Sequence, residues 1–207
     1  MASGKAWNRR GAVIGGASLA AGVTWALREP SGTSRSGIPG KDTLRRGNAA
    51  EPETLDNSLA SSDGDDNIIG DLMVGLVTQD IGARPIAGMA TEWKISPDGL
   101  TWNFKLREAQ WSDGVPVTAE DFVFSWRRLL DPAVAARYGN YLYLVKNAEP
   151  INAGKLPPNA LGISAVAERE LEVRLEHPAP YLLQMLMHPC THPLPRHVVT
   201  AKGKDWS

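Results

Sequence analysis

Alternation of apolar and polar residues between positions 100 and 106 predicts a strand at the centre of this chain. Apolar side chains occupy every second position of the run: Leu100, Trp102, Phe104 and Leu106. Because successive side chains of a strand point to opposite faces, these four share one face. The run Ser96–Gly99 is a strong turn signal, and it separates this strand from a second candidate strand at 91–95. We therefore expect strands at 91–95 and 100–106 to form a β-hairpin.

A helical pattern follows this strand. Its apolar residues recur at helical spacing: Phe122, Val123, Trp126, Leu129 and Leu130. Thr118 is a suitable N-cap, and Asp121 three residues later completes a capping-box pattern. Asp131 and Pro132 end the helix, because the residue before a proline avoids the helical conformation. The run Trp111–Gly114 predicts a turn between the strand and the helix.

Shorter patterns complete a mixed α/β (α+β) interpretation of the chain. Strands at 161–166 and 170–175 are expected to form a second hairpin, since apolar residues alternate in the latter. Asp65 or Asp66 is expected to cap a helix at 67–76. The other expected elements are a strand at 43–46, structured loops at 51–56 and 82–88, and helices at 138–145, 181–187 and 195–202.

The N-terminal region has the plan of an export signal. The run Gly11–Leu27 carries no charge, and three basic residues precede it: Lys5, Arg9 and Arg10. A basic flank before an apolar run is typical of secretory signals, and without cleavage this run is at the short end of a membrane span. Residues 28–41 are rich in Gly, Ser and Pro, which predicts a disordered linker. We therefore expect an export signal or anchor at 1–27, this linker, and a solute-binding domain at 42–207.

Composition and motifs argue against metal, cofactor and nucleic-acid chemistry. The formal net charge of the 207 residues is −1, so bulk charge implies no nucleic-acid partner. His188, Cys190 and His192 are candidate metal ligands, but Pro189 and Pro193 prevent the helix that would direct such a pair at one ion. The sequence contains no nucleophile elbow or phosphate-binding loop, so we expect no cofactor and no enzymatic activity.

The run 90–126, which holds the first hairpin, the turn and the capped helix, resembles the signature region of oligopeptide-binding proteins. These are the extracytoplasmic receptors of peptide ABC importers, bacterial extracellular solute-binding protein family 5. Arg45–Asn57 resembles the family's N-terminal strand and Glu-Pro-x-Thr-Leu-Asp loop, and the likeness covers 42–207. Further motifs match in order: Asp131-Pro132, Tyr138, Leu171–Leu175, His177–Tyr181 and Met187–Pro189. The resemblance implies a two-lobed, type II periplasmic-binding-protein-like fold, present here as part of the first lobe with its inserted subdomain.

The resemblance also implies two ligand-binding residues. Tyr138 matches a tyrosine that lines the peptide cleft in the family. By its own chemistry, a tyrosine here offers a ring for packing and a hydroxyl for a peptide backbone group. From the residues alone, a core aromatic at this position is an equal alternative. Ser61 stands where the family carries an acidic residue, so a charge near the cleft is missing. The family's segment around His188 is a structural connection.

The function implied is the substrate-binding component of an importer. In this family such a receptor is a periplasmic monomer, which binds an oligopeptide between its lobes and delivers it to the membrane subunits of the ABC importer. We expect this chain to be a truncated fragment that binds peptides weakly or not at all by itself. The alternatives are a membrane-tethered interaction protein without transport activity, anchored by Gly11–Leu27, and a hydrolase whose site has no sequence motif.

Overall fold

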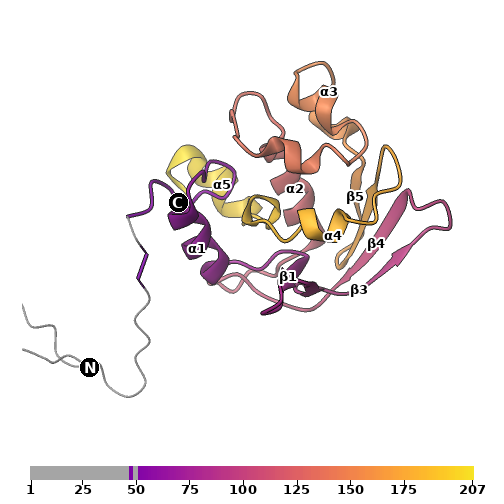
Figure 1. Cartoon of the computed structure of the whole chain (residues 1–207). Coiled ribbons are helices and arrows are strands. Elements are labelled where there is room, and N and C mark those ends of the chain that lie inside the picture. The colour runs from indigo at the N-terminus through magenta and orange to yellow at the C-terminus, as the bar shows by residue number, and fades with distance from the viewer. Residues whose placement is uncertain (1–46, 49–50) are drawn as a thin grey trace, which may run out of the picture. The chain divides into compact units, whose positions relative to one another are not determined.

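A four-stranded antiparallel sheet forms one side of the domain (Figure 1). The computed structural model describes residues 47–48 and 51–207; the expected export signal, linker and 43–46 strand lie outside these residues. The strands run in the spatial order β3, β4, β6, β5. Their bounds are β3 (Ala90–Ile95), β4 (Thr101–Leu106), β5 (Ile163–Ala167) and β6 (Glu170–Arg174). Both expected hairpins, β3–β4 and β5–β6, are thereby confirmed.

The register of the sheet collects the alternating apolar residues on one face. Trp102 lies opposite Val173 on β6, and Phe104 lies opposite Leu171. Each of these four side chains is buried, whereas the residues between them on β4 are partly or fully exposed. The period-two pattern of the sequence thus predicts which face of β4 the core covers.

Helix α2 (Ala119–Leu129) packs against β5 and contributes its apolar stripe to the same core. The side chains of Phe122 and Trp126 are completely buried. At the N-terminus of α2, the carboxylate of Asp121 accepts a hydrogen bond of 2.9 Å from the backbone N–H of Thr118. This is the reciprocal bond of a capping box, as the sequence predicts.

The remaining elements surround this core and bring the C-terminal part of the chain beside α1 (Figure 1). The helices are α1 (Asp63–Leu72), α3 (Ala148–Asn152), α4 (Leu182–Met185) and α5 (Arg196–Lys202). A two-stranded hairpin consists of β1 (Val77–Gln79) and β2 (Pro85–Ala87). Short 3₁₀ turns span Gly139–Leu142, Pro158–Ala160, Pro189–Thr191 and Gly203–Asp205. No helix among the described residues has both the length and the apolar character needed to cross a bilayer.

The expected position of the first helix is wrong by about one turn. Helix α1 begins at Asp63, because Ser62 is its N-cap: the Ser62 hydroxyl accepts from the backbone N–H of Asp65 at 3.1 Å. The helix ends at Leu72, so Leu76, expected on its apolar face, instead precedes β1. Asp65, expected as a cap, occupies the third helical position and completes a capping box.

Two further expectations are corrected. The segment 82–88, expected as a loop, contains β2, which is too short for its alternation to be recognised. The expected helix 138–145 is a 3₁₀ turn followed by a break, because Asn147 adopts a left-handed conformation with φ 66°. Helix α3 then begins at Ala148 and includes Pro150, which is tolerated in a first turn since that N–H has no helical acceptor.

Candidate functional site

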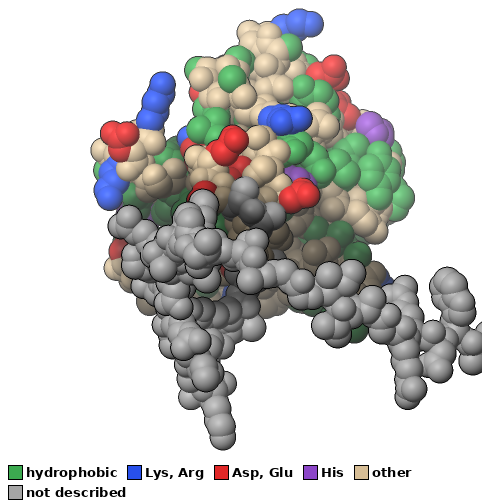
Figure 2. All heavy atoms as spheres, turned by 60° about the vertical axis from the view of Figure 1, so that its left-hand side comes forward, with side chains coloured by type: hydrophobic (Ala, Val, Ile, Leu, Met, Phe, Trp, Pro, Cys, Tyr) green, Lys and Arg blue, Asp and Glu red, His purple; other side chains and the backbone are tan. Residues whose placement is uncertain are grey.

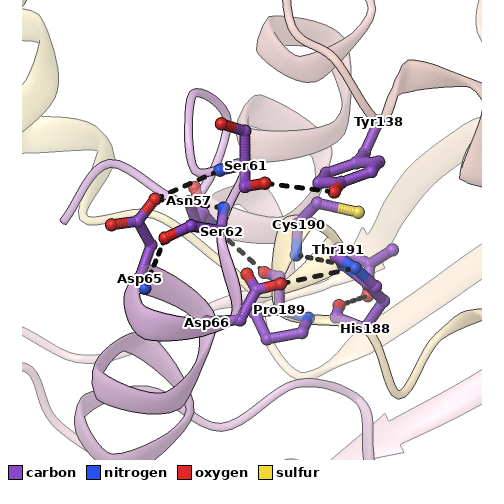
Figure 3. A network of polar contacts seen from close by, with 10 residues as sticks. All are labelled: Asn57, Ser61, Ser62, Asp65, Asp66, Tyr138, His188, Pro189, Cys190 and Thr191. Atoms are coloured by element: carbon purple, nitrogen blue, oxygen red, sulfur yellow. Dashed lines mark hydrogen bonds and ion pairs between the residues drawn. The ribbon is translucent and has the colours of Figure 1, made fainter. Parts of the chain in front are cut away.

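Three aromatic rings from two distant segments meet beside α1 and form what we call the ring cluster: Tyr138, Tyr141 and His188 (Figure 3 shows two of them). The centroids of Tyr141 and His188 are 4.3 Å apart, and those of Tyr138 and His188 are 5.0 Å apart. Tyr138 and Tyr141 meet edge to face at 5.8 Å, a favoured geometry for aromatic pairs. The cluster therefore presents a partly exposed aromatic surface.

The structure brings the two sequence-predicted site residues together. The Tyr138 hydroxyl donates to the backbone carbonyl of Ser61 at 3.4 Å, across 77 positions of sequence. At this distance the hydrogen bond is long for a hydroxyl donor. The side chain of Ser61 points away from Tyr138, so it is the main chain at position 61 that contacts the ring cluster (Figure 3).

A buried carboxylate fixes the loop that carries Ser61. The oxygens of Asp65 accept from three backbone N–H groups: those of Glu53 at 2.8 Å, Ser61 at 3.3 Å and Ser62 at 3.2 Å. Burial acts to raise the pKa of Asp65, but these hydrogen bonds favour the ionised form and the net pKa is lowered. The ionised carboxylate thus holds the Ser61 carbonyl in place against Tyr138.

Asp66 and His188 form an acid–imidazole pair at the edge of the ring cluster. The His188 Nε2 atom lies 3.6 Å from a carboxylate oxygen of Asp66, and its Nδ1 accepts from the backbone N–H of Cys190 at 3.2 Å. Burial lowers the pKa of His188, an effect that the Asp66 carboxylate opposes. Burial also raises the pKa of Asp66, which the charge of His188 opposes. Sequence reasoning missed Asp66 and Tyr141, because only the tertiary structure brings them to Tyr138.

The segment after His188 is held from two sides by polar side chains. Asn57 donates to the carbonyls of Pro189 at 3.3 Å and His192 at 3.0 Å. From α2, Ser125 donates to the His192 carbonyl at 2.6 Å, and Trp126 Nε1 donates to the Thr191 carbonyl at 2.8 Å. These bonds give the segment a structural role as a connection between the first loop and α2.

The His188–His192 segment does not form a metal centre in the structure. Burial raises the pKa of the Cys190 thiol far above its ordinary value, and a thiol must lose its proton to bind a metal ion. The neighbouring carboxylate of Asp66 raises this pKa further. Among residues 47–48 and 51–207, no group of three or more His, Cys, Asp or Glu side chains is placed to hold a metal ion.

A buried ion pair secures the loop 51–62, which carries Ser61. The guanidinium of Arg128 binds both carboxylate oxygens of Asp56, at 2.8 and 2.5 Å. Trp206 Nε1 donates to the same carboxylate at 3.1 Å. The contacts of Arg128 and Trp206 tie the loop 51–62 to α2 and to the C-terminal residues.

On the face of the molecule shown in Figure 2, acidic and basic side chains are interspersed.

The family model described as "Bacterial extracellular solute-binding proteins, family 5 Middle" matches residues 84–207. The chain belongs to this family. Among curated members of family 5, the periplasmic oligopeptide-binding protein OppA of Salmonella typhimurium is 38% identical over 198 residues, which are 91% of this chain and 36% of that protein. The chain spans about a third of the length of the curated family 5 relatives that it matches.

Solved structures of family 5 proteins are similar to this chain in both sequence and fold. Haemophilus influenzae OppA in complex with the peptide RPPGFSPFR is 42% identical, with a TM-score of 0.75 over 77% of this chain and 32% of that chain. Listeria monocytogenes OppA bound to peptide is 39% identical, with a TM-score of 0.72 over 74% of this chain and 31% of that chain. The family resemblance and the fold class predicted from the sequence are confirmed.

The family also includes a relative with a different type of ligand in its name. The probable deoxycholate-binding periplasmic protein YgiS of Escherichia coli is 39% identical over 170 residues, 81% of this chain and 32% of that protein. Family membership alone therefore does not decide the ligand class, which has to be argued from the site.

Proposed function

We propose that this chain contributes one wall of the peptide site in an extracytoplasmic receptor that supplies oligopeptides to an ABC importer. The observation that supports this proposal is the 38 to 42% identity to OppA proteins over most of the chain, two of them solved with peptide. The OppA proteins of Salmonella typhimurium and Haemophilus influenzae are named as periplasmic, and the basic, apolar N-terminus of this chain is the corresponding export signal. The membrane subunits of the importer are the partner.

The ring cluster and Ser61 are the proposed ligand contacts. The Tyr138 hydroxyl makes only a long bond to the Ser61 carbonyl, so a main-chain group of a peptide competes for it at low cost. The rings of Tyr138 and Tyr141 supply apolar surface for a side chain. Hydrogen bonds to main-chain groups recognise what all peptides share, and no bond of the ligand changes.

The chain by itself should bind peptide at least about 100-fold more weakly than a complete receptor. Binding proteins of this type close two lobes around the ligand, and one wall supplies only part of the contacts. We propose to test this with a chimera in which residues 47–207 replace the matching part of H. influenzae OppA. Calorimetry with RPPGFSPFR should show micromolar binding by the chimera and little heat from the chain alone. A folded chimera that binds no peptide would contradict the proposed function.

Tyr138 is tested in the same chimera. Removal of the hydroxyl in Tyr138→Phe should weaken peptide binding by about 1 kcal/mol, roughly fivefold, and Tyr138→Ala by more, because the ring surface is also lost. Tyr143→Phe is the matched control, since the Tyr143 hydroxyl bonds to Asn152 at 2.8 Å and does not contact the ring cluster. Equal affinity of all three variants would exclude Tyr138 as a ligand contact.

A further inference from the structure

A cavity of about 460 Å³ is lined by residues of α2 and of the segments beside it. Neither Ser61 nor any member of the ring cluster lines it. Its apolar wall comes from α2, α5 and the loop after α2: Val123, Phe124, Val134 and Val199. Its charged groups are three arginines and two acids: Arg127, Arg128, Arg196, Glu120 and Asp131. This combination of apolar wall and arginine is typical of sites that hold an organic anion.

Arg127 is the unusual residue of this cavity. Its Nε atom is buried and has no hydrogen-bond partner among residues 47–48 and 51–207. No ion pair of the described part of the chain includes Arg127 either. A guanidinium stays charged at all relevant pH values, so burial of an unpaired N–H costs free energy. A buried donor without a protein partner calls for a specific explanation, and a bound ion or water molecule beside it is one.

The neighbouring charges do not satisfy Arg127. Arg128, the next residue, is already bound through two nitrogens to Asp56. One carboxylate oxygen of Asp131 accepts from the backbone N–H of Ala133 at 2.9 Å. Arg196 also lines the cavity, and among the described residues only its backbone N–H donates a hydrogen bond, to Asp121. The cavity therefore offers the guanidinium groups of Arg127 and Arg196 together with two carboxylates, Asp131 and Glu120, that limit how much negative charge an occupant can carry.

We propose that this cavity binds a carboxylate with a short apolar chain, paired to Arg127. A planar carboxylate matches the fork of donors on a guanidinium, and the apolar wall accepts the hydrocarbon part. A dianionic phosphate is disfavoured by the two acids that line the cavity. Both a free carboxylic acid and the acidic group of a polypeptide have this chemistry. The proposal concerns a site separate from the peptide site and does not depend on it.

The test uses the full chain, with the Arg127 Nε–H resonance as the readout of binding. Sodium butyrate is titrated against sodium chloride at equal ionic strength, with acetate, inorganic phosphate and N-acetylglutamate amide as further arms. We expect a saturable shift with a dissociation constant on the order of millimolar for butyrate. Acetate should bind more weakly, since it lacks the apolar chain. Tighter binding of the glutamate derivative than of butyrate would identify a polypeptide as the source of the carboxylate. Tighter binding of butyrate would identify a free acid as the source.

Variants make the assignment specific. Because Arg127→Gln removes the Arg127 resonance, butyrate binding by this variant is measured by the rise in unfolding temperature that butyrate causes. The variant should need at least tenfold more butyrate than the wild type for the same rise. Arg127→Lys should recover only part of this response, because an ammonium lacks the bidentate fork. Lys155→Gln, which removes an exposed charge outside the cavity, should respond as the wild type does. An unchanged response of Arg127→Gln, or saturable binding of phosphate alone, would overturn the proposal.

Discussion

The imidazole of His192 illustrates how one residue can make the domain sensitive to acid. The side chain is buried beneath the first loop, and a Cβ atom on Gly75 would lie 2.5 Å from its ring. Burial, together with the nearby His188, lowers the pKa of His192 to about 4. The neutral ring is accommodated in the folded state, whereas the charged ring is not.

Stability should therefore fall as the pH is lowered from about 6.5 towards 4. The unfolded state binds a proton at an ordinary pKa of about 6.5, before the folded state does, so acid favours unfolding. The expected loss from this residue is about 2 kcal/mol by pH 5, measured by urea unfolding at pH 7.5, 6 and 5. The variant His192→Gln should flatten this dependence, and His177→Gln, at an exposed position, should leave it unchanged.

Arg128 and Arg84 provide a comparison of a buried and an exposed ion pair. The variant Arg128→Ala leaves the carboxylate of Asp56 without its main partner in a site where only 4% of that side chain is exposed, so we expect a loss of about 3 kcal/mol. Arg84→Ala breaks the pair with Asp80, in which Arg84 is 80% exposed, and should cost less than about 1 kcal/mol. Chemical denaturation measures both, and equal losses would contradict the structural role of Asp56.

At the scale of elements, two glycines should respond in opposite ways to the same change. Gly70 lies in the interior of α1, and an added Cβ would meet nothing within 4 Å. Gly70→Ala should therefore stabilise the protein by about 0.8 kcal/mol, because alanine loses less backbone entropy in a helix. At Gly162, before β5, a Cβ would lie 2.7 Å from the Lys146 Cβ and 2.8 Å from the Arg174 carbonyl oxygen. Gly162→Ala should cost about 2 kcal/mol, and thermal unfolding of both variants tests the pair.

Elements marked by several local sequence signals were predictable, whereas short elements were not. The β3–β4 hairpin and α2 follow from alternation over six residues, a turn signal and a capping box. The β1–β2 hairpin has three-residue strands, in which alternation carries almost no information. The start of α1 depended on which of several polar residues, Ser62 or Asp65, acted as the cap, and only the geometry of the loop decides this.

The same distinction applies to the candidate site. Tyr138 and Ser61 were chosen from a family resemblance, and nothing local in either residue indicates that they meet. Their contact depends on the loop held by Asp65 and on the turn that begins at Gly139. Asp66 was interpreted as a possible cap, whereas its side chain faces His188. Long-range pairs of this kind have no sequence periodicity from which they could be inferred.

At the scale of the whole molecule, the four-stranded sheet ends at two edge strands, β3 and β5. β5 is an edge strand, and Val166 on it is 54% exposed. An apolar edge strand can pair with another chain. Val166→Lys should therefore reduce light scattering during incubation at high concentration, while stability changes by less than about 0.5 kcal/mol. Val115→Lys, at an exposed position outside any strand, is the control and should not change the scattering.

The bond from Trp206 to Asp56 also sets the order of events during synthesis on the ribosome. Asp56 leaves the exit tunnel early, yet its partner Trp206 is added 150 residues later. In the same way, Asn57 has no His192 carbonyl to donate to until that residue has been added. The first loop, 51–62, therefore cannot adopt its final arrangement until Trp206 has been translated. Contacts of such long sequence separation form slowly, and the nascent loop spends that interval within reach of chaperones and proteases.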